Sequence, residues 1–166
     1  MASRGNSKAK NDILEMLTDD HQRVKRAFRD AEKLAEQEDM ESLEQLVRQT
    51  CAELQVHAQV EEDLLYPAVR EAIKEPELVD EAEIEHASAK DLIAQLENMT
   101  GGDPKFAATF KVLGEYVKHH IKEEESEMFE QLNRTGIEWE PLLQEMQELR
   151  SQLMQEHGLA EAGADA

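Results

Sequence analysis

Apolar residues recur at intervals of three and four along most of this 166-residue chain, the spacing that places them on one face of an α-helix. The first stripe comprises Ile13, Leu17, Val24, Phe28 and Ala31. It predicts an amphipathic helix over about residues 11–37. The residues before it are polar and basic, so we expect residues 1–10 to be a disordered arm.

A second stripe predicts a long helix that ends before Pro76, because proline cannot continue a helix without breaking it. Its members are Leu43, Leu46, Thr50, Leu54, Leu64, Ala68 and Ala72. Pro67 lies within the last turns of this helix. We therefore expect a kink or a local unwinding there.

Two more stripes begin at proline-containing boundaries. Glu75-Pro76 opens the third helix, with Pro76 suited to the first helical position, and Gly101-Gly102 closes it. Asp103-Pro104 provides an N-cap and starts the fourth helix, which stops near residues 133–136. The members are Leu78 or Val79, Ala82, Ala89, Ile93 and Leu96, then Phe106, Phe110, Leu113, Val117 and Met128. Four long helices with short turns predict an all-α fold, an antiparallel up-down-up-down four-helix bundle over residues 11–135.

A fifth stripe follows the predicted bundle and comprises Trp139, Leu142, Met146, Leu149 and Leu153. It predicts an additional C-terminal amphipathic helix over residues 137–158, and residues 159–166 are expected to be a disordered tail. The amphipathic face offers a surface for a partner or a second copy. The sequence is therefore compatible with a monomer and with a homodimer that forms through this helix.

Each of the four bundle stripes is interrupted at an inward-facing position by a histidine, and two are interrupted by a glutamate one turn later. The interrupting residues are His21, His57, Glu61, His86, His120 and Glu124. Measured along the helices at 1.5 Å per residue, all of them fall within a slab about 10 Å thick. Six polar side chains are thus predicted to meet in one layer of the core.

An internal repeat supports this layer. Asp20-His21 recurs as Glu85-His86, and the segment 57–62 recurs as 120–125, at offsets of about 65 and 63 residues. The first two helices then relate to the next two by a pseudo-two-fold axis. Such symmetry predicts two metal ions, one on each side of the axis.

Composition restricts the chemistry of this layer. A single cysteine, Cys51, excludes an intramolecular disulfide and a thiolate-rich metal site, which leaves histidine and carboxylate as ligands. Imidazole with carboxylate suits iron, manganese or zinc. Four nitrogens, two bridging carboxylates and an oxo or hydroxo bridge supply about ten of the roughly twelve bonds that two octahedral ions accept. About two positions remain for O2, NO, peroxide or water.

Charge and hydropathy restrict the partners. Lys and Arg number 18 against 38 for Asp and Glu, and the formal net charge of -20 disfavours nucleic acid and anionic membrane surfaces. No apolar run approaches the roughly 20 residues of a membrane span, and the N-terminus lacks the apolar stretch of a signal peptide. We therefore expect a soluble, cytoplasmic protein whose partner is a small molecule.

The order His21, His57 to Glu61, His86, and His120 to Glu124 resembles the hemerythrin-like family with its HHE cation-binding domain, whose pattern is H, HxxxE, H, HxxxE on four successive helices. The resemblance covers about residues 11–133 and extends to Leu65-Tyr66-Pro67 and to Met128-Phe129. It implies two iron ions with an oxo or hydroxo bridge. Manganese or zinc is an alternative.

The sequence departs from oxygen-carrying hemerythrins at one ligand. These proteins have a fifth histidine one turn along the third helix, and Lys90 stands at that spacing after His86. Glu83, one turn before His86, is a candidate replacement or else a solvated surface residue. Tyr66 and Tyr116 are candidates for hydrogen-bond donors or radical partners at the centre, with core packing as the simpler interpretation.

Three functional hypotheses follow. The first is a protein that binds or senses O2, NO, a related oxidant or iron itself. The second is a di-iron enzyme that consumes peroxide, in the manner of a catalase or peroxidase, or that repairs iron centres. The third is a helical partner-binding module without redox function.

Overall fold

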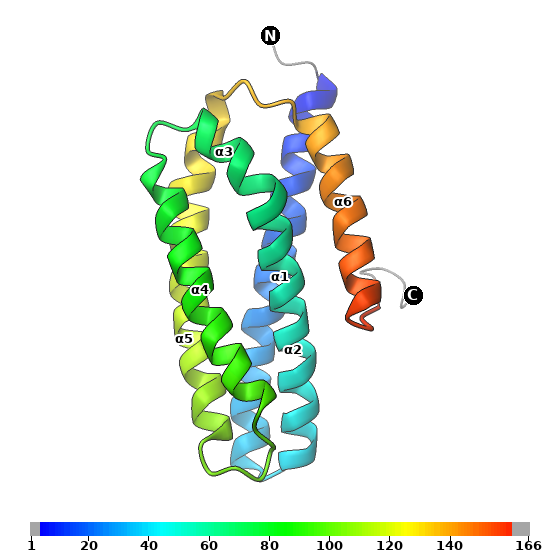
Figure 1. The fold of residues 1–166 in the computed structure, drawn as a ribbon, viewed down its shortest axis with the longest axis vertical. Helices are drawn as coiled ribbons and strands as arrows, with labels where there is room; N and C mark the ends of the chain where they lie inside the picture. Colours follow the sequence, from blue (N-terminus) through cyan, green and yellow to red (C-terminus); the bar gives the residue numbers. More distant parts are fainter. Residues whose placement is uncertain (1–3, 161–166) are drawn as a thin grey trace.

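The computed structural model describes residues 4–160. Within that range all regular secondary structure is helical, and turns connect the helices. Four antiparallel helical columns form the bundle, and a fifth helix lies against one side of its upper half (Figure 1). The columns are α1 (Arg4–Glu36), α2 (Met40–Val60) continued by α3 (Tyr66–Ala72), α4 (Glu77–Glu97), and α5 (Phe106–Glu123). The fifth helix is α6 (Trp139–Glu156). The predicted all-α bundle with an added C-terminal helix is confirmed.

The helix α1 begins at Arg4, so the predicted disordered arm is wrong for residues 4–10. These turns are held by contacts with the segment that leads into α6. The side chain of Asn6 donates to the carbonyl of Ile137 (3.1 Å) and accepts from the backbone N–H of Trp139 (2.7 Å). Local composition favoured disorder, and long-range contacts of this kind override it. Residues 1–3 of the arm, and residues 161–166 of the predicted tail, lie outside the described part of the chain.

Two π-helical segments interrupt the bundle columns at equivalent places. The first, Glu61–Leu65, lies between α2 and α3 directly before Pro67, where an irregularity was predicted. The second, Glu124–Met128, follows α5 and is itself followed by a 3₁₀-helical segment, Phe129–Arg134. No proline accompanies the second segment, so proline alone does not explain these turns. Each segment begins at a glutamate of the predicted layer, which fits the frequent occurrence of π turns at functional sites.

Two helix starts differ from the prediction. Pro76 is the N-cap of α4 and not its first residue. Asp103 does not cap α5, because its carboxylate accepts a hydrogen bond from the backbone N–H of Thr100 (2.6 Å) across the preceding turn, and α5 begins at Phe106. A side chain at Gly101 would meet the Met40 carbonyl oxygen at 2.7 Å, so this turn requires glycine.

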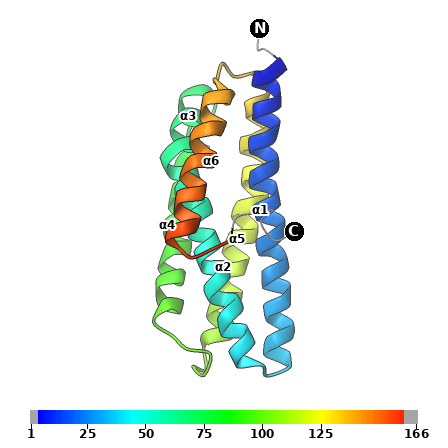
Figure 2. The same ribbon diagram turned by 90° about the vertical axis from the view of Figure 1, so that its right-hand side faces the viewer.

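Two apolar cores fill the bundle, one on each side of the polar layer. The upper core includes Leu17, Tyr66 and Met146, and α6 contributes to it. The lower core includes Phe28, Phe110 and Leu113. It lies on the other side of the polar layer, toward the end of the bundle that holds the α1–α2 and α4–α5 turns. The helix α6 packs on α1 and α2 (Figure 2). It buries Trp139, Leu142, Met146, Leu153 and Met154. Its apolar stripe is thus used within the chain, and dimerisation through this helix remains only a prediction.

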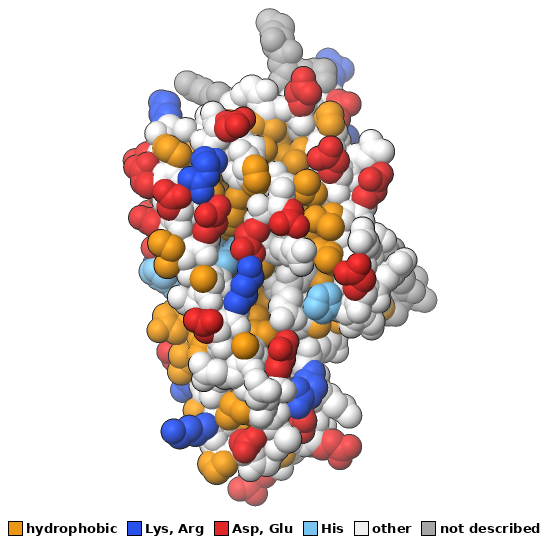
Figure 3. All heavy atoms as spheres, in the orientation of Figure 1, with side chains coloured by type: hydrophobic (Ala, Val, Ile, Leu, Met, Phe, Trp, Pro, Cys, Tyr) orange, Lys and Arg blue, Asp and Glu red, His pale blue; other side chains and the backbone are white. Residues whose placement is uncertain are grey.

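On the face seen in Figure 3, acidic side chains outnumber basic ones among the charged residues. This distribution agrees with the formal net charge of -20. Among the described helices, none has the length and apolar character that a membrane span requires.

Candidate metal centre

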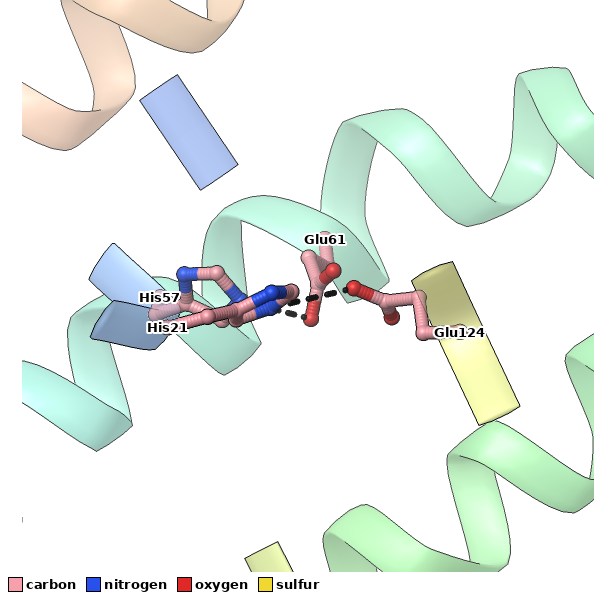
Figure 4. A group of neighbouring side chains, drawn as sticks. All are labelled: His21, His57, Glu61 and Glu124. Atoms are coloured by element: carbon pink, nitrogen blue, oxygen red, sulfur yellow. Dashed lines mark ion pairs between the residues drawn. The ribbon is translucent and has the colours of Figure 1, made fainter. Parts of the chain in front are cut away.

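The six side chains predicted to meet in the core are brought together and are all buried. His21 comes from α1, His57 from α2, His86 from α4 and His120 from α5, while Glu61 and Glu124 are the first residues of the two π-helical segments. Figure 4 shows the imidazoles of His21 and His57 directed at the carboxylates of Glu61 and Glu124.

Each glutamate is shared between two histidines from different halves of the bundle. The contacts are His57 Nε2 to Glu61 Oε1 (3.2 Å), His86 Nε2 to Glu61 Oε1 (3.3 Å), His21 Nε2 to Glu124 Oε1 (3.3 Å) and His120 Nε2 to Glu124 Oε2 (3.3 Å). Two four-residue groups result, His21 with His57 and His86 with His120, and both include Glu61 and Glu124. This is the arrangement expected for two ions bridged by two carboxylates.

The donor atoms of this layer fit bound cations. His21 Nε2, His57 Nε2, Glu61 Oε2 and Glu124 Oε1 are buried without a hydrogen-bond partner. The Nε2 atoms of His86 and His120 lie 3.2 Å apart and face each other. Buried polar atoms left unpaired in this way are costly, and nitrogen and carboxylate oxygen are suitable ligands for iron, manganese or zinc.

A second set of carboxylates lies behind the histidines, each close to an Nδ1 atom. The pairs are His57 with Asp20 (2.8 Å), His120 with Glu85 (2.9 Å), His21 with Glu125 (3.2 Å) and His86 with Glu62 (3.4 Å). A carboxylate that accepts from Nδ1–H leaves the Nε2 lone pair free for a metal and fixes the ring.

The role of these outer carboxylates was not predicted from the sequence, although the internal repeat contains a signal for them. Asp20 and Glu85 are equivalent in the two halves, and each backs the histidine on the next helix of its own half. Glu62 and Glu125 are likewise equivalent, and each reaches the histidine of the opposite half. The pseudo-two-fold relation therefore extends beyond the six inner residues.

The carboxylates also set the charge of the histidines. Burial disfavours a charged imidazole, but Glu61 and Asp20 outweigh it and raise the pKa of His57 well above its ordinary value. Burial likewise opposes the charged form of His120, and the hydrogen bond to Glu124 raises its pKa to about 10. Protons on these rings balance the buried carboxylates, and bound cations supply the same balance by displacing them.

Tyr66 belongs to the centre. Its buried hydroxyl donates to Glu124 Oε2 (2.5 Å) and lies 3.3 Å from Glu61 Oε1. Burial and the two carboxylates raise the pKa of Tyr66 well above its usual value, so the phenol remains a donor.

The two remaining candidates from the sequence, Tyr116 and Glu83, lie outside the inner layer. Tyr116 is 54% exposed and lines the cavity that adjoins the centre, and it is in neither four-residue group. Glu83 forms an ion pair with Arg70 (3.1 Å) on the surface and is in neither four-residue group, which supports the solvated interpretation. His119 is exposed, whereas its neighbour His120 is buried in the layer as the stripe predicted. The position of the missing fifth histidine is filled by Lys90, which pairs with Glu62 (2.7 Å).

A cavity of about 60 Å³ adjoins the centre and is lined by all four inner histidines. Its other walls are largely apolar and include Val24, Leu54, Ile93, Val117 and Ile121. Arg150 and Met154 of α6 line it as well. A space of this size holds a few water-sized atoms, which matches a diatomic or peroxide ligand.

Comparison with known proteins gives three findings. The family model described as the hemerythrin HHE cation binding domain matches residues 12–132. A curated protein of Nostoc sp. (strain PCC 7120), named DNA nickase, is 26% identical over 164 residues, which cover 98% of this chain and 46% of the relative. This chain thus spans about half the length of that relative. The crystal structure of a hemerythrin HHE cation binding domain-containing protein from Mycobacterium kansasii is similar with a TM-score of 0.68, 22% identity and 86% of each chain covered, which supports the fold.

Proposed function

Because the chain belongs to the hemerythrin HHE cation-binding domain family, we propose that it holds two iron ions and binds O2, NO or a related small oxidant beside them. In this proposal His21 and His57 bind one ion, His86 and His120 bind the other, and Glu61 and Glu124 bridge them. The observation that carries it is the set of two histidine pairs that share both buried glutamates, with Nε2 and carboxylate atoms that have no hydrogen-bond partner.

The iron pair, when bound, supplies the electrons for reversible binding or reduction of the oxidant. The residues of the chain hold and protect this centre. Outer carboxylates would keep the Nδ1 protons of His21, His57 and His120 in place, and the Tyr66 hydroxyl donates a hydrogen bond to the Glu124 carboxylate. The apolar lining of the cavity favours an uncharged ligand of a few atoms over a large or charged substrate.

The experiment is anaerobic titration of the purified protein with ferrous iron, followed by exposure to O2. We expect two iron ions per chain and a visible absorption band that changes on oxidation. His120→Ala should lose about one ion and change the band, because it removes a buried ligand. His119→Ala is the matched control, since that neighbouring histidine is exposed. A wild-type protein that retains no iron would contradict the proposal.

A second candidate function is peroxide consumption, and the position of Tyr66 favours it. A buried phenol that touches both shared carboxylates is placed to pass a proton to the centre by way of Glu61 or Glu124. Tyr66→Phe removes only the hydroxyl, so iron content should stay at two per chain. Peroxide consumption should fall by roughly a factor of 100, within the range for loss of a general acid. An unchanged rate would leave oxidant binding as the better description.

The name of the Nostoc relative supplies one further outcome to test. DNA cleavage requires approach to a polyanion, which a net charge of -20 disfavours. We therefore expect the iron-loaded or manganese-loaded protein to leave supercoiled plasmid DNA intact. Nicking that is lost in His120→Ala and kept in His119→Ala would show that this centre cleaves DNA after all.

A further inference from the structure

The helix α6 lies beyond the region that the family model matches, yet one of its side chains reaches the metal centre's surroundings. The guanidinium of Arg150 donates to both carboxylate oxygens of Asp20, through Nη1 to Oδ2 (2.6 Å) and Nη2 to Oδ1 (2.7 Å). The side chains are only 14% and 8% exposed. A two-point, largely buried pair of this kind is both strong and directional.

Asp20 connects this arginine to a predicted ligand. Its Oδ2 atom, which accepts from Arg150, lies 2.8 Å from Nδ1 of His57. Three elements thus contribute to one series of contacts: α6 provides the guanidinium, α1 the carboxylate and α2 the imidazole. A carboxylate fixed at both oxygens holds the Nδ1–H of His57, and hence the direction of its Nε2 atom, more firmly than one in water.

The other outer carboxylates lack such support. Glu85, the counterpart of Asp20, is 25% exposed, and besides His120 it approaches the exposed ring of His119, with 3.9 Å between Nε2 and Oε2. Glu62 is paired with Lys90, which is 49% exposed. Within the described residues, Asp20 is therefore the one outer carboxylate that a buried arginine anchors.

We propose that Arg150 is a positioning residue for the metal ion held by His21 and His57, so that α6 completes one half of the centre and not the other. The inference rests on the two-ion centre proposed above. Arg150 and Met154 also line the cavity beside the histidines, so the same helix that fixes Asp20 closes part of the ligand site.

The test compares Arg150→Ala, Arg150→Lys and Arg23→Ala in the full chain, with zinc as a redox-silent probe titrated into metal-free protein. Arg150→Ala should bind one ion with wild-type affinity and the other roughly 10- to 100-fold more weakly. Arg150→Lys keeps the charge but not the two-point geometry, and should recover part of the loss. Arg23→Ala should bind as wild type, because Arg23 touches Asp20 at 3.2 Å through a 39% exposed side chain.

A second measurement separates positioning from a general loss of stability. Leu113→Ala opens a cavity in the lower core, away from Asp20, and should lower the melting temperature without changing either zinc affinity. In the zinc-loaded wild type, the Nδ1–H proton of His57 should give a sharp NMR signal that broadens in Arg150→Ala through exchange with water. It should remain sharp in Arg23→Ala.

The outcomes are distinguishable. Wild-type protein that binds no zinc or iron overturns the proposed function itself. Arg150→Ala that binds both ions normally, or that loses both equally, overturns the role of Arg150 while leaving the centre intact. Leu113→Ala that reproduces the loss of one ion also overturns it, because stability alone would then be the cause.

Discussion

The two halves of the candidate centre present the same inner residues and different surroundings. On one side Asp20, only 8% exposed, lies between His57 and the guanidinium of Arg150. On the other side Glu85, 25% exposed, backs His120 from a position that water reaches. The repeat in the chain makes the ligands equivalent, but the added helix α6 packs mainly on α1, α2 and the π-helical segment Glu61–Leu65. A symmetric ligand set can therefore hold two inequivalent ions, because affinity depends on the groups that orient the ligands as well as on the ligands.

The largest effect on metal binding is expected at the two glutamates that both halves share. Glu61→Ala and Glu124→Ala each remove a carboxylate that both four-residue groups share, so the metal content should fall from two ions per chain to below one. Elemental analysis after desalting measures this. Glu83→Ala is the matched control, because Glu83 pairs with Arg70 on the surface and should leave two ions bound. A Glu61→Ala protein that retains two ions would show that the carboxylates do not bridge.

The next effect should distinguish the halves. Asp20→Asn should weaken one ion by up to about 100-fold, because it removes the negative charge and one of the two acceptor oxygens that hold His57 and Arg150. It should also lower the free energy of unfolding by about 3 kcal/mol, since Arg150 loses its counter-charge in a site only 14% exposed. Zinc titration and chemical denaturation measure the two quantities.

Glu85→Gln is the symmetric counterpart of this variant. Water can replace the lost contact at a carboxylate that is 25% exposed, so we expect a loss near the lower end of the range, about tenfold. Equal losses in Asp20→Asn and Glu85→Gln would mean that the halves are equivalent and that α6 has no influence on the centre.

Removal of the metal ions tests the difference between the two halves in the wild-type protein, without a substitution. A chelator should withdraw the two ions in separate phases whose rates differ by about tenfold, with the faster phase from the His86 and His120 side. Glu85→Gln should accelerate only the fast phase. A single phase in the wild-type protein would contradict the predicted difference.

The inner layer could be predicted from the sequence because each of its members interrupts an apolar stripe. A histidine at the inward position between Leu17 and Val24 is conspicuous, since burial there needs a partner. The family match and the all-α bundle were predicted on the same pattern and are confirmed. Helical periodicity alone was sufficient, because the layer depends on which face of each helix points inward.

The outer carboxylates could not be selected in this way. With 38 acidic residues in the chain, a glutamate beside a ligand is common whether or not it contacts a histidine. The contact between Asp20 and Arg150 joins residues 130 positions apart and depends on where α6 packs, which no local pattern specifies. The helical start at Arg4 was missed for a related reason, since Asn6 and the segment before α6 hold each other. The sequence therefore did not predict the outer carboxylates or the contacts that α6 makes with the bundle.

The smallest effect is expected at Lys90, which stands at the spacing where the family resemblance led us to look for a fifth histidine. Lys90 contacts Glu62, the outer carboxylate of His86, but the side chain is 49% exposed and the pair is open to solvent. Exposed ion pairs contribute at most about 1 kcal/mol, so Lys90→Ala should weaken the ion on this side by no more than about fivefold. The same zinc titration measures it. A loss of zinc affinity as large as that in Arg150→Ala would show that both halves depend on an anchoring cation. Burial of the Asp20–Arg150 pair would then not explain why the His21 and His57 half differs from the other.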